Sequence, residues 1–184
     1  KLIVSPFQTR DFFLKLINRE IKNAKEGKEA WMVLKLNSLV DKKLTYKLYE
    51  ASNAGVKIKI IARAICVLIP GVKGMSENIE AFGIVDKFLE HARVFVFCNN
   101  GDREFFISSA DWMQRNLDYR IEVTTPITDP QIQDDIWKIL QIQLQDNTKA
   151  RLISAENINR YRKTDSEIAV RSQFEIYNYC KKNC

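Results

Sequence analysis

Residues 30–63 read AWMVLKLNSLVDKKLTYKLYEASNAGVKIKIIAR, and the rest of the predicted architecture extends from this stretch. An apolar run over 30–36 precedes a helical pattern over 41–54, and a second apolar run over 56–62 follows. This alternation of strand, helix and strand predicts two parallel strands joined by a crossover helix. Ligands bind beyond the carboxyl ends of strands in such sheets, and Arg63 stands at that point.

The same rhythm continues outward in both directions. On the N-terminal side, a short strand over 2–4 precedes a helix over 9–25, with Thr9 as its cap. On the C-terminal side, we expect a hairpin of 94–97 and 104–107, a short helix opened by Asp111, a strand over 121–124, and helices over 129–145 and 166–181. The expectation is an α/β fold with a mostly parallel central sheet, helices on both faces and a C-terminal helical extension.

Composition places the chain among ordinary globular domains. Of its 184 residues, 46% are hydrophobic and 28% are charged, which excludes a disordered or collagen-like chain. The length suits one domain, which we divide into a catalytic part over 1–145 and an extension over 146–184 packed on it. Because the sequence opens at Lys1 directly in an apolar run, we expect a piece of a longer chain.

Charge and cysteine usage narrow the set of partners. The net charge of +6 indicates a mild preference for anions but is too small to identify nucleic acid. The sequence contains no run of about 18 apolar residues, so we expect no membrane-spanning helix. The four cysteines form no Cys-x-x-Cys pair and only one histidine accompanies them, so we expect free thiols in a reducing cytosol and no zinc site.

His91 is the only histidine, and a lone histidine is more often structural than catalytic. Its position just before a strand, with Arg93 two residues on, favours a role with an anionic substrate. Imidazole can accept a phosphoryl group or transfer protons near neutral pH, and guanidinium offers paired donors to phosphate oxygens. Arg63 also has two interpretations, as a partner for a local carboxylate or as a phosphate ligand at the strand end.

A polar stretch, SSAD from Ser108 to Asp111, follows the strand over 104–107. Its hydroxyls and backbone amides can form an anion cradle, and the stretch fits an ordinary Ser/Asp helix cap equally well. The residues alone leave both interpretations open.

Several long motifs occur together in one order: LIVSPF at 2–7, LKLNSL at 34–39, RAICVLIPG at 63–71, SENI at 76–79, IVDKFLEHARV at 84–94 and ISSADWMQRNLD at 107–118. With these motifs the chain resembles the last domain of bacterial polyphosphate kinase. The resemblance is specific from residue 1 to about 127 and looser beyond.

The resemblance implies a phospholipase-D-like fold that occurs twice per chain, with this sequence as the second copy. It implies reversible transfer of the terminal phosphoryl of ATP to inorganic polyphosphate through a phosphohistidine in the preceding domain. The implied partners are ATP or ADP, polyphosphate and the preceding domains of the same chain, in a homo-oligomer. Mg²⁺ is implied with ligands upstream of this sequence, which itself is expected to hold no metal. We expect a cytoplasmic location, with peripheral membrane association left open, no nucleic-acid partner, and an inactive domain when isolated.

Residue by residue, Arg63 matches the family's phosphate- and ATP-contacting arginine, and His91 matches its second active-site histidine. His91-x-Arg93 stands where the phospholipase-D-like pattern has His-x-Lys. The expected supporting residues are Arg93, Ser108, Ser109, Asp111, Arg115 and Glu122. Ala64 departs from the family, which usually has glycine there, and a methyl group beside Arg63 can alter the local backbone.

Two other functions remain open at this stage. One is a phospholipase-D-like phosphodiesterase or nuclease that dimerises to bring two histidines together. The basic charge favours this function, and Arg93 in place of lysine argues against it. The other is a polyphosphate-binding module without activity of its own, whose binding would weaken steeply with salt.

Overall fold

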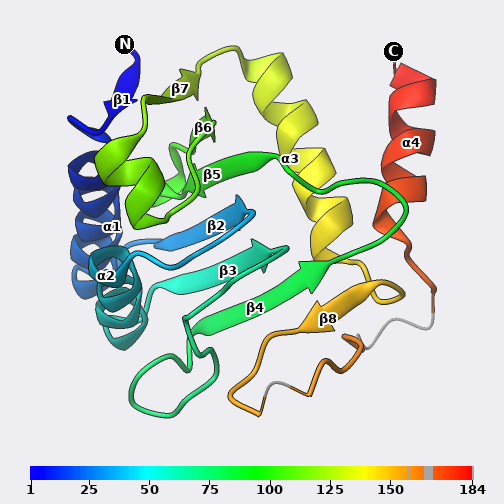
Figure 1. The fold of residues 1–184 in the computed structure, drawn as a ribbon, viewed down its shortest axis with the longest axis horizontal. Coiled ribbons are helices and arrows are strands. Elements are labelled where there is room, and N and C mark those ends of the chain that lie inside the picture. Colours follow the sequence, from blue (N-terminus) through cyan, green and yellow to red (C-terminus); the bar gives the residue numbers. More distant parts are fainter. Residues whose placement is uncertain (157, 164–167, 184) are drawn as a thin grey trace.

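The protein folds around one eight-stranded sheet with helices on both faces (Figure 1). The computed structural model describes residues 1–156, 158–163 and 168–183. The strands are β1 Ile3–Ser5, β2 Trp31–Leu36, β3 Lys57–Ala62, β4 Ile79–Ile84, β5 Arg93–Phe97, β6 Glu104–Ser108, β7 Glu122–Ile127 and β8 Ala150–Leu152. The helices are α1 Thr9–Lys25, α2 Lys42–Asn53, α3 Pro130–Leu144 and α4 Ser172–Asn183, with a π-helical turn at Arg115–Tyr119.

The strand order is β1-β7-β6-β5-β2-β3-β4-β8, and the sheet is mixed. Only the pairs β2–β3 and β3–β4 are parallel, and the other five pairs are antiparallel. The α/β class and the helices on both faces are confirmed, but the expectation of a mostly parallel sheet is wrong. It extended the crossover rhythm of 30–63 to β1, which instead pairs antiparallel with β7 at the far edge.

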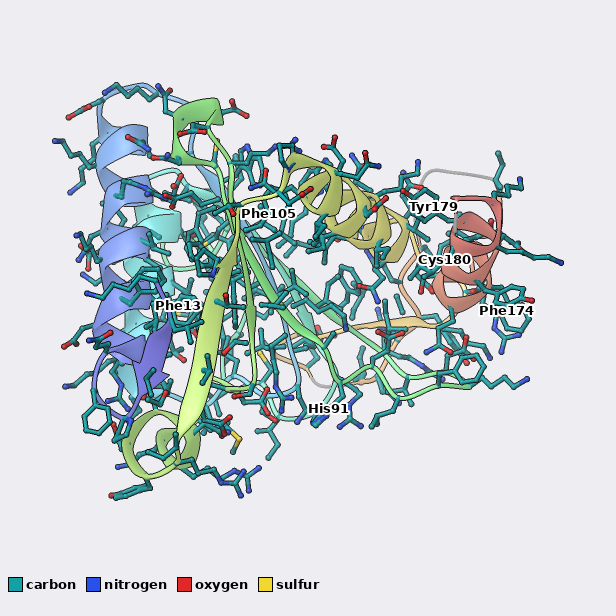
Figure 2. All side chains as sticks on the ribbon, turned by 90° about the horizontal axis from the view of Figure 1, so that it is seen from above. Phe13, His91, Phe105, Phe174, Tyr179 and Cys180 are labelled. Carbon is teal, nitrogen blue, oxygen red and sulfur yellow. The ribbon has the colours of Figure 1, made fainter. Side chains whose placement is uncertain are left out.

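The two faces of the sheet bury separate apolar clusters. On β2, Met32, Leu34 and Leu36 pack against α1 and α2, while Val33 joins Leu140 of α3 on the opposite face. Figure 2 shows this layering from above, with Phe13 between α1 and the sheet. Because β2 is buried on both faces, it reads as a continuous apolar run rather than an alternating one.

The starts of α1, α2, α3 and α4 agree with the expectations to different degrees. α2 and α3 begin at the expected places, where Asp41 accepts a hydrogen bond from one backbone amide of the first turn and Asp129 accepts from two. Thr9 is not a cap: it is the first residue of α1, and its hydroxyl accepts a hydrogen bond from Ser5 at 2.8 Å. α4 begins at Ser172 rather than at 166, and residues 166 and 167 of the expected helix lie outside the described residues.

The sequence did not predict two of the strands, β4 and β8. β4 is an inner strand whose pattern is interrupted by Gly83, and β8 lies in a polar stretch and covers the edge of β4. Gly83 is required by packing, because a Cβ there would lie 2.6 Å from the backbone oxygen of Ala62. The missing side chain therefore lets β4 approach the end of β3, directly before Arg63.

Candidate functional site

The carboxyl ends of β2, β3 and β4 meet the start of β5 at one edge of the sheet. Asn37 follows β2, Arg63 follows β3, and Arg93 opens β5 opposite Ser108 of β6. His91 lies two residues before β5, in the loop that leaves β4, and Figure 2 labels it. The polar residues that the sequence singled out at strand ends therefore gather at one edge.

A continuous series of hydrogen bonds links Arg63 to His91 through three other side chains. Arg63 Nη2 donates to Asn37 Oδ1, and Asn37 Nδ2 donates to Asp111 Oδ2 at 3.3 Å. Arg93 grips the same carboxylate, with Nε 3.1 Å from Oδ1 and Nη2 2.8 Å from Oδ2. Arg93 Nη2 also lies 3.1 Å from His91 Nε2, and its Nη1 donates to the His91 carbonyl at 3.1 Å.

This arrangement fixes the imidazole through a guanidinium. Guanidinium can only donate hydrogen bonds, so the contact suits the His91 tautomer whose Nε2 accepts. Arg93 is in turn oriented by Asp111, which leaves it little rotational freedom. His91 is exposed, and its ring is oriented by Arg93, whose guanidinium is shared between the Asp111 carboxylate and the imidazole.

Asp111 has a different role from the expected helix cap. Its Oδ1 accepts hydrogen bonds from the backbone amides of Asn37 and Ser38, both at 2.9 Å, and the side chain is buried. Burial alone would raise the pKa of Asp111, but the hydrogen bonds from Arg93, Ser38 and Asn37 hold this pKa below its usual range. Asp111 is therefore a charged cross-link between the ends of β2 and β5.

Arg63 lines a hollow of about 360 Å³ beyond the ends of β3 and β4. The second cation of this hollow is Arg151 of β8, whose guanidinium carbon lies 3.5 Å from the ring centre of Tyr161. Among the described residues, no carboxylate lines the hollow, and buried Arg63 Nε has no hydrogen-bond partner. An anion that enters would lie beside Arg63 and Arg151, with no carboxylate among the described residues that line the hollow. His91 is not among the residues that line the hollow.

The remaining expected residues form a neighbouring network. The Ser108 hydroxyl lies 2.7 Å from that of Thr124, and the Ser109 hydroxyl donates to Glu122. The other oxygen of Glu122 accepts from Asn116 Nδ2 at 2.7 Å.

These contacts tie the end of β6 to the start of β7. Arg115 is exposed at the start of the π-helical turn. The serines are thus engaged by neighbouring side chains, and the SSAD stretch is neither a helix cap nor a free anion cradle.

Sequence reasoning missed three residues that support this edge. Asn37 bridges Arg63 and Asp111, and Lys35 forms an ion pair with Glu90 at 3.0 Å although its side chain is only 4% exposed. A lysine inside the apolar run of β2 was an available signal, because such a residue is almost never fully buried without a partner.

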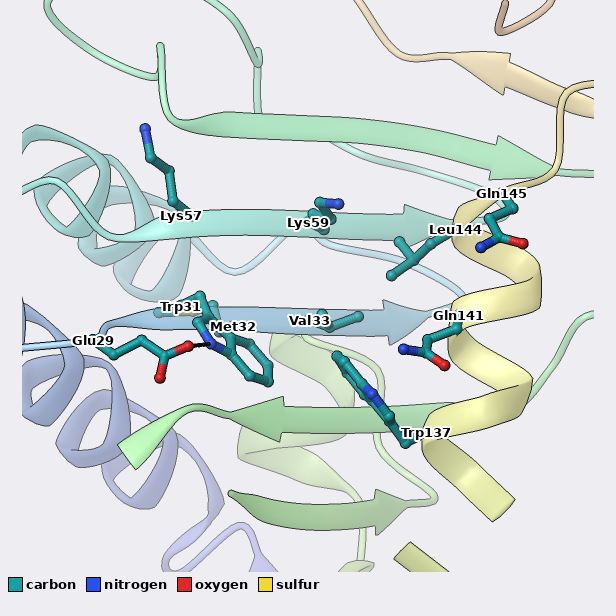
Figure 3. A pocket seen from close by; sticks show the side chains of 10 residues that line it. All are labelled: Glu29, Trp31, Met32, Val33, Lys57, Lys59, Trp137, Gln141, Leu144 and Gln145. Atoms are coloured by element: carbon teal, nitrogen blue, oxygen red, sulfur yellow. Dashed lines mark hydrogen bonds between the residues drawn. The ribbon is translucent and has the colours of Figure 1, made fainter. Parts of the chain in front are cut away.

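A second hollow, of about 550 Å³, lies on the α3 side of the sheet (Figure 3). Trp31 and Trp137 stack there with ring centres 5.3 Å apart, and Lys59 and Gln141 complete parts of its wall. It is formed by the first halves of β2 and β3, so it shares no residue with the series that joins Arg63 to His91.

Within residues 1–156, 158–163 and 168–183, no group of three or more His, Cys, Asp or Glu side chains could hold a metal ion. Asp111 and Glu122, the carboxylates of the site, are already engaged by Arg93, Ser109 and Asn116. This donor set does not fit Mg²⁺, which prefers several free oxygens in octahedral geometry. In the same part of the chain, no helix is long and apolar enough to cross a membrane.

Sequence comparisons connect the chain to one family. A family model described as polyphosphate kinase C-terminal domain 2 matches residues 2–173. The polyphosphate kinase of Vibrio vulnificus strain YJ016 is 53% identical over 180 residues, which span 98% of this chain and 26% of that protein. The polyphosphate kinase of Escherichia coli K12 is 47% identical over 180 residues, again 26% of its length. The chain therefore spans well under half of these curated relatives.

Structural comparisons agree with this relationship. A crystal structure of polyphosphate kinase from Porphyromonas gingivalis superposes with a TM-score of 0.94 at 45% identity, covering 100% of this chain and 28% of the other. Nuc from Salmonella typhimurium, a phospholipase D family member, gives a TM-score of 0.61 at 14% identity, covering 84% of this chain and 97% of Nuc. The second likeness shows the phospholipase-D-like fold alone.

Proposed function

Because the chain belongs to the polyphosphate kinase family, in which it matches the C-terminal domain 2, we propose that it serves as the C-terminal catalytic domain of such a kinase. The kinase reversibly transfers the terminal phosphoryl group of ATP to inorganic polyphosphate. The observation that supports this function best is the hydrogen-bonded series from Arg63 through Asp111 to His91 at the carboxyl ends of the strands.

Arg63 has the role of binding phosphate oxygens. Phosphoryl transfer needs positioning and neutralisation of oxygen charge more than covalent chemistry from the protein. The hollow beside Arg63 offers two guanidinium groups and no carboxylate among the described residues, which suits a chain of phosphates. Asn37 fixes the direction of Arg63 without neutralising its charge.

His91 has the role of contacting the transferred phosphate and assisting its transfer. The ring is oriented by Arg93, which Asp111 holds through two hydrogen bonds. A ring of fixed orientation can donate or accept a proton at a defined atom without reorganisation during the reaction. Arg93 adds a positive charge beside the ring, where an anionic substrate gains from it.

The covalent phosphohistidine lies outside this chain, whose single histidine is His91. A nitrogen of that other histidine attacks the terminal phosphorus of ATP, and the bond between this phosphorus and the bridging oxygen of ADP breaks. A terminal oxygen of polyphosphate then attacks the phosphorus, and the phosphorus–nitrogen bond breaks to restore the histidine. His91 and Arg63 act on the phosphate oxygens in both steps.

Other parts of the proposal rest on the family resemblance. They comprise Mg²⁺ bound by ligands outside this chain, assembly into a homo-oligomer and a cytoplasmic location. We also treat 1–145 and 146–184 as a catalytic domain and its packed extension. Two contacts across this boundary support the division: β8 pairs with β4, and Arg162 Nε donates to Glu80 Oε1 at 2.9 Å.

The test uses ATP labelled at the terminal phosphate, with the whole kinase and with this domain alone. The whole kinase should form an acid-labile phosphohistidine and polyphosphate, and the isolated domain should form neither. Robust phosphohistidine formation by the isolated domain would overturn the proposal. Cleavage of DNA or of a bis-phosphodiester without metal would instead favour the phosphodiesterase function.

A further inference from the structure

The loop over 85–92 carries His91, yet the loop contains no helix or strand of its own. Its apolar side chains do not anchor it, because Val85, Phe88 and Leu89 are 66%, 61% and 69% exposed. A segment with few buried apolar contacts opens at low free-energy cost. Whatever holds His91 beside Arg93 must therefore come from polar contacts to the rest of the domain.

The carboxylate of Glu90, the neighbour of His91, is bound by side chains from three elements. Its Oε2 is 3.0 Å from Lys35 Nζ on β2 and accepts from Gln143 Nε2 on α3 at 2.8 Å. Its Oε1 accepts from Gln173 Nε2 on α4 at 2.9 Å. Lys35, Gln143 and Gln173 are all buried. In the part of the chain that the structure describes, the Glu90 carboxylate is the counter-charge of the enclosed Lys35 ammonium group.

Gln173 also pairs with the loop backbone. Its Oε1 accepts from the Phe88 amide at 2.9 Å, and its Nε2 donates to the Phe88 carbonyl at 2.8 Å. One side-chain amide thus satisfies both backbone groups of Phe88, as a neighbouring strand would. Two residues before Gln173, Arg171 binds Asp86 with bonds of 2.8 and 2.6 Å.

We propose that Gln173, supported by Arg171, is a positioning residue that holds the 85–92 loop in the conformation in which His91 meets Arg93. The proposal rests on the proposed function, because it gives the C-terminal segment a part in the same reaction. It follows that α4 acts on catalysis without touching the substrate. Its contribution is to pre-order a loop that its own side chains leave exposed.

The test replaces Gln173 by alanine in the whole kinase. Hydrogen exchange should accelerate at least tenfold in peptides that cover 85–92 while exchange in β2 and β5 stays unchanged. The turnover number, kcat, should fall about tenfold to a hundredfold, because small displacements of a catalytic group carry losses of this order. The KM for ATP should change less than threefold, since Arg63 is untouched.

The matched control is Gln133→Ala on α3. Gln133 donates to the Ile127 carbonyl at 2.7 Å, so its loss also removes a bond from glutamine to backbone, but at the end of β7 rather than at the 85–92 loop. Exchange over 85–92 and kcat should both stay as in the unaltered kinase. Gln173→Glu gives a graded second variant: it keeps the acceptor for the Phe88 amide but loses the donor and places a second carboxylate beside Glu90. Its kcat should also fall.

A double variant separates positioning from general destabilisation. In a His91→Ala background, adding Gln173→Ala should lower kcat no further, because the positioned group is already absent. A further tenfold loss in that background would overturn the positioning role. Unchanged exchange over 85–92 in Gln173→Ala would overturn it as well. If His91→Ala itself leaves kcat unchanged, the proposed function fails instead, whatever Gln173 does to loop exchange.

Discussion

Arg93 and Asp111 form a two-bond ion pair inside the site, with Nε 3.1 Å from Oδ1 and Nη2 2.8 Å from Oδ2. Their side chains are 12% and 2% exposed, so the pair is largely withdrawn from water. Removal of one member of such a pair leaves an uncompensated charge. Because the pair also lies midway between Arg63 and His91, it links the stability of the domain to the geometry of the site.

Asp111→Asn should lower the free energy of unfolding by about 3 kcal/mol, the order found when one partner of a buried ion pair is removed. Urea unfolding of the purified protein measures this change. The control is Asp134→Asn, which removes a carboxylate that is 75% exposed and 3.8 Å from Arg103. Exposed pairs contribute less than about 1 kcal/mol, so equal losses from both variants would contradict the assigned role of Asp111.

Acid should destabilise the protein through Asp111 and Asp146. Burial opposes ionisation of both carboxyls, but hydrogen bonds from Arg93 and from Ser172, respectively, hold their pKa values below the usual range. A lowered folded pKa means that the stabilisation is present above the unfolded pKa of about 3.9 and is lost as the pH falls through the folded pKa. Urea unfolding at several pH values should therefore show stability falling below about pH 4.

The variant Asp111→Asn should show a shallower acid slope, and an identical slope would exclude its contribution. Glu20 has the opposite sign. Burial raises the pKa of Glu20, so its stabilising effect is present below the unfolded pKa and is lost as the pH rises through the folded pKa. Glu20→Gln should accordingly flatten the decline in stability between the unfolded and the folded pKa of Glu20.

Arg63→Ala in the whole kinase should lower phosphate affinity and rate together, with a loss of about a hundredfold to a thousandfold in kcat/KM. This is the range seen when one charged or polar donor to a transition state is removed. Steady-state kinetics with varied ATP and polyphosphate measure the loss.

His91→Ala should lower mainly kcat, because in the proposed mechanism the ring assists transfer while Arg63 still binds phosphate. Comparison of the KM of Arg63→Ala with that of His91→Ala tests this division of roles. If neither substitution alters turnover, the site assignment is wrong.

Gly83→Ala should destabilise the domain by about 2 kcal/mol, a typical cost of overpacking. The new Cβ would lie 2.6 Å from the Ala62 backbone oxygen, so either β4 or the end of β3 must move. Since Arg63 follows Ala62, binding of tripolyphosphate should weaken as well. The control is Lys59→Ala, at an exposed position of the neighbouring strand β3. It should change stability by less than about 0.5 kcal/mol.

Much of the local structure could be predicted from the chain because its signals are local. The hairpin of β5 and β6 follows from apolar runs around Asn-Asn-Gly-Asp, and α3 follows from Asp129 with proline after it. β4 and β8 could not, because a glycine-interrupted inner strand and a polar edge strand resemble loops until their neighbours are known. Neither the anion cradle nor the helix cap describes the SSAD stretch, because Asp111 binds Arg93, which comes from another strand.

The family, the α/β class and the identities of Arg63 and His91 as the residues of interest were already available from the order of motifs along the chain. Periodicity and motif order are properties of neighbours in sequence, which is why they needed no coordinates. Strand order, the mixed direction of the sheet and the contacts among Asn37, Asp111 and Arg93 arise only on folding. They depend on residues far apart in sequence that meet when the sheet forms. No local pattern encodes which buried donor will pair with which acceptor.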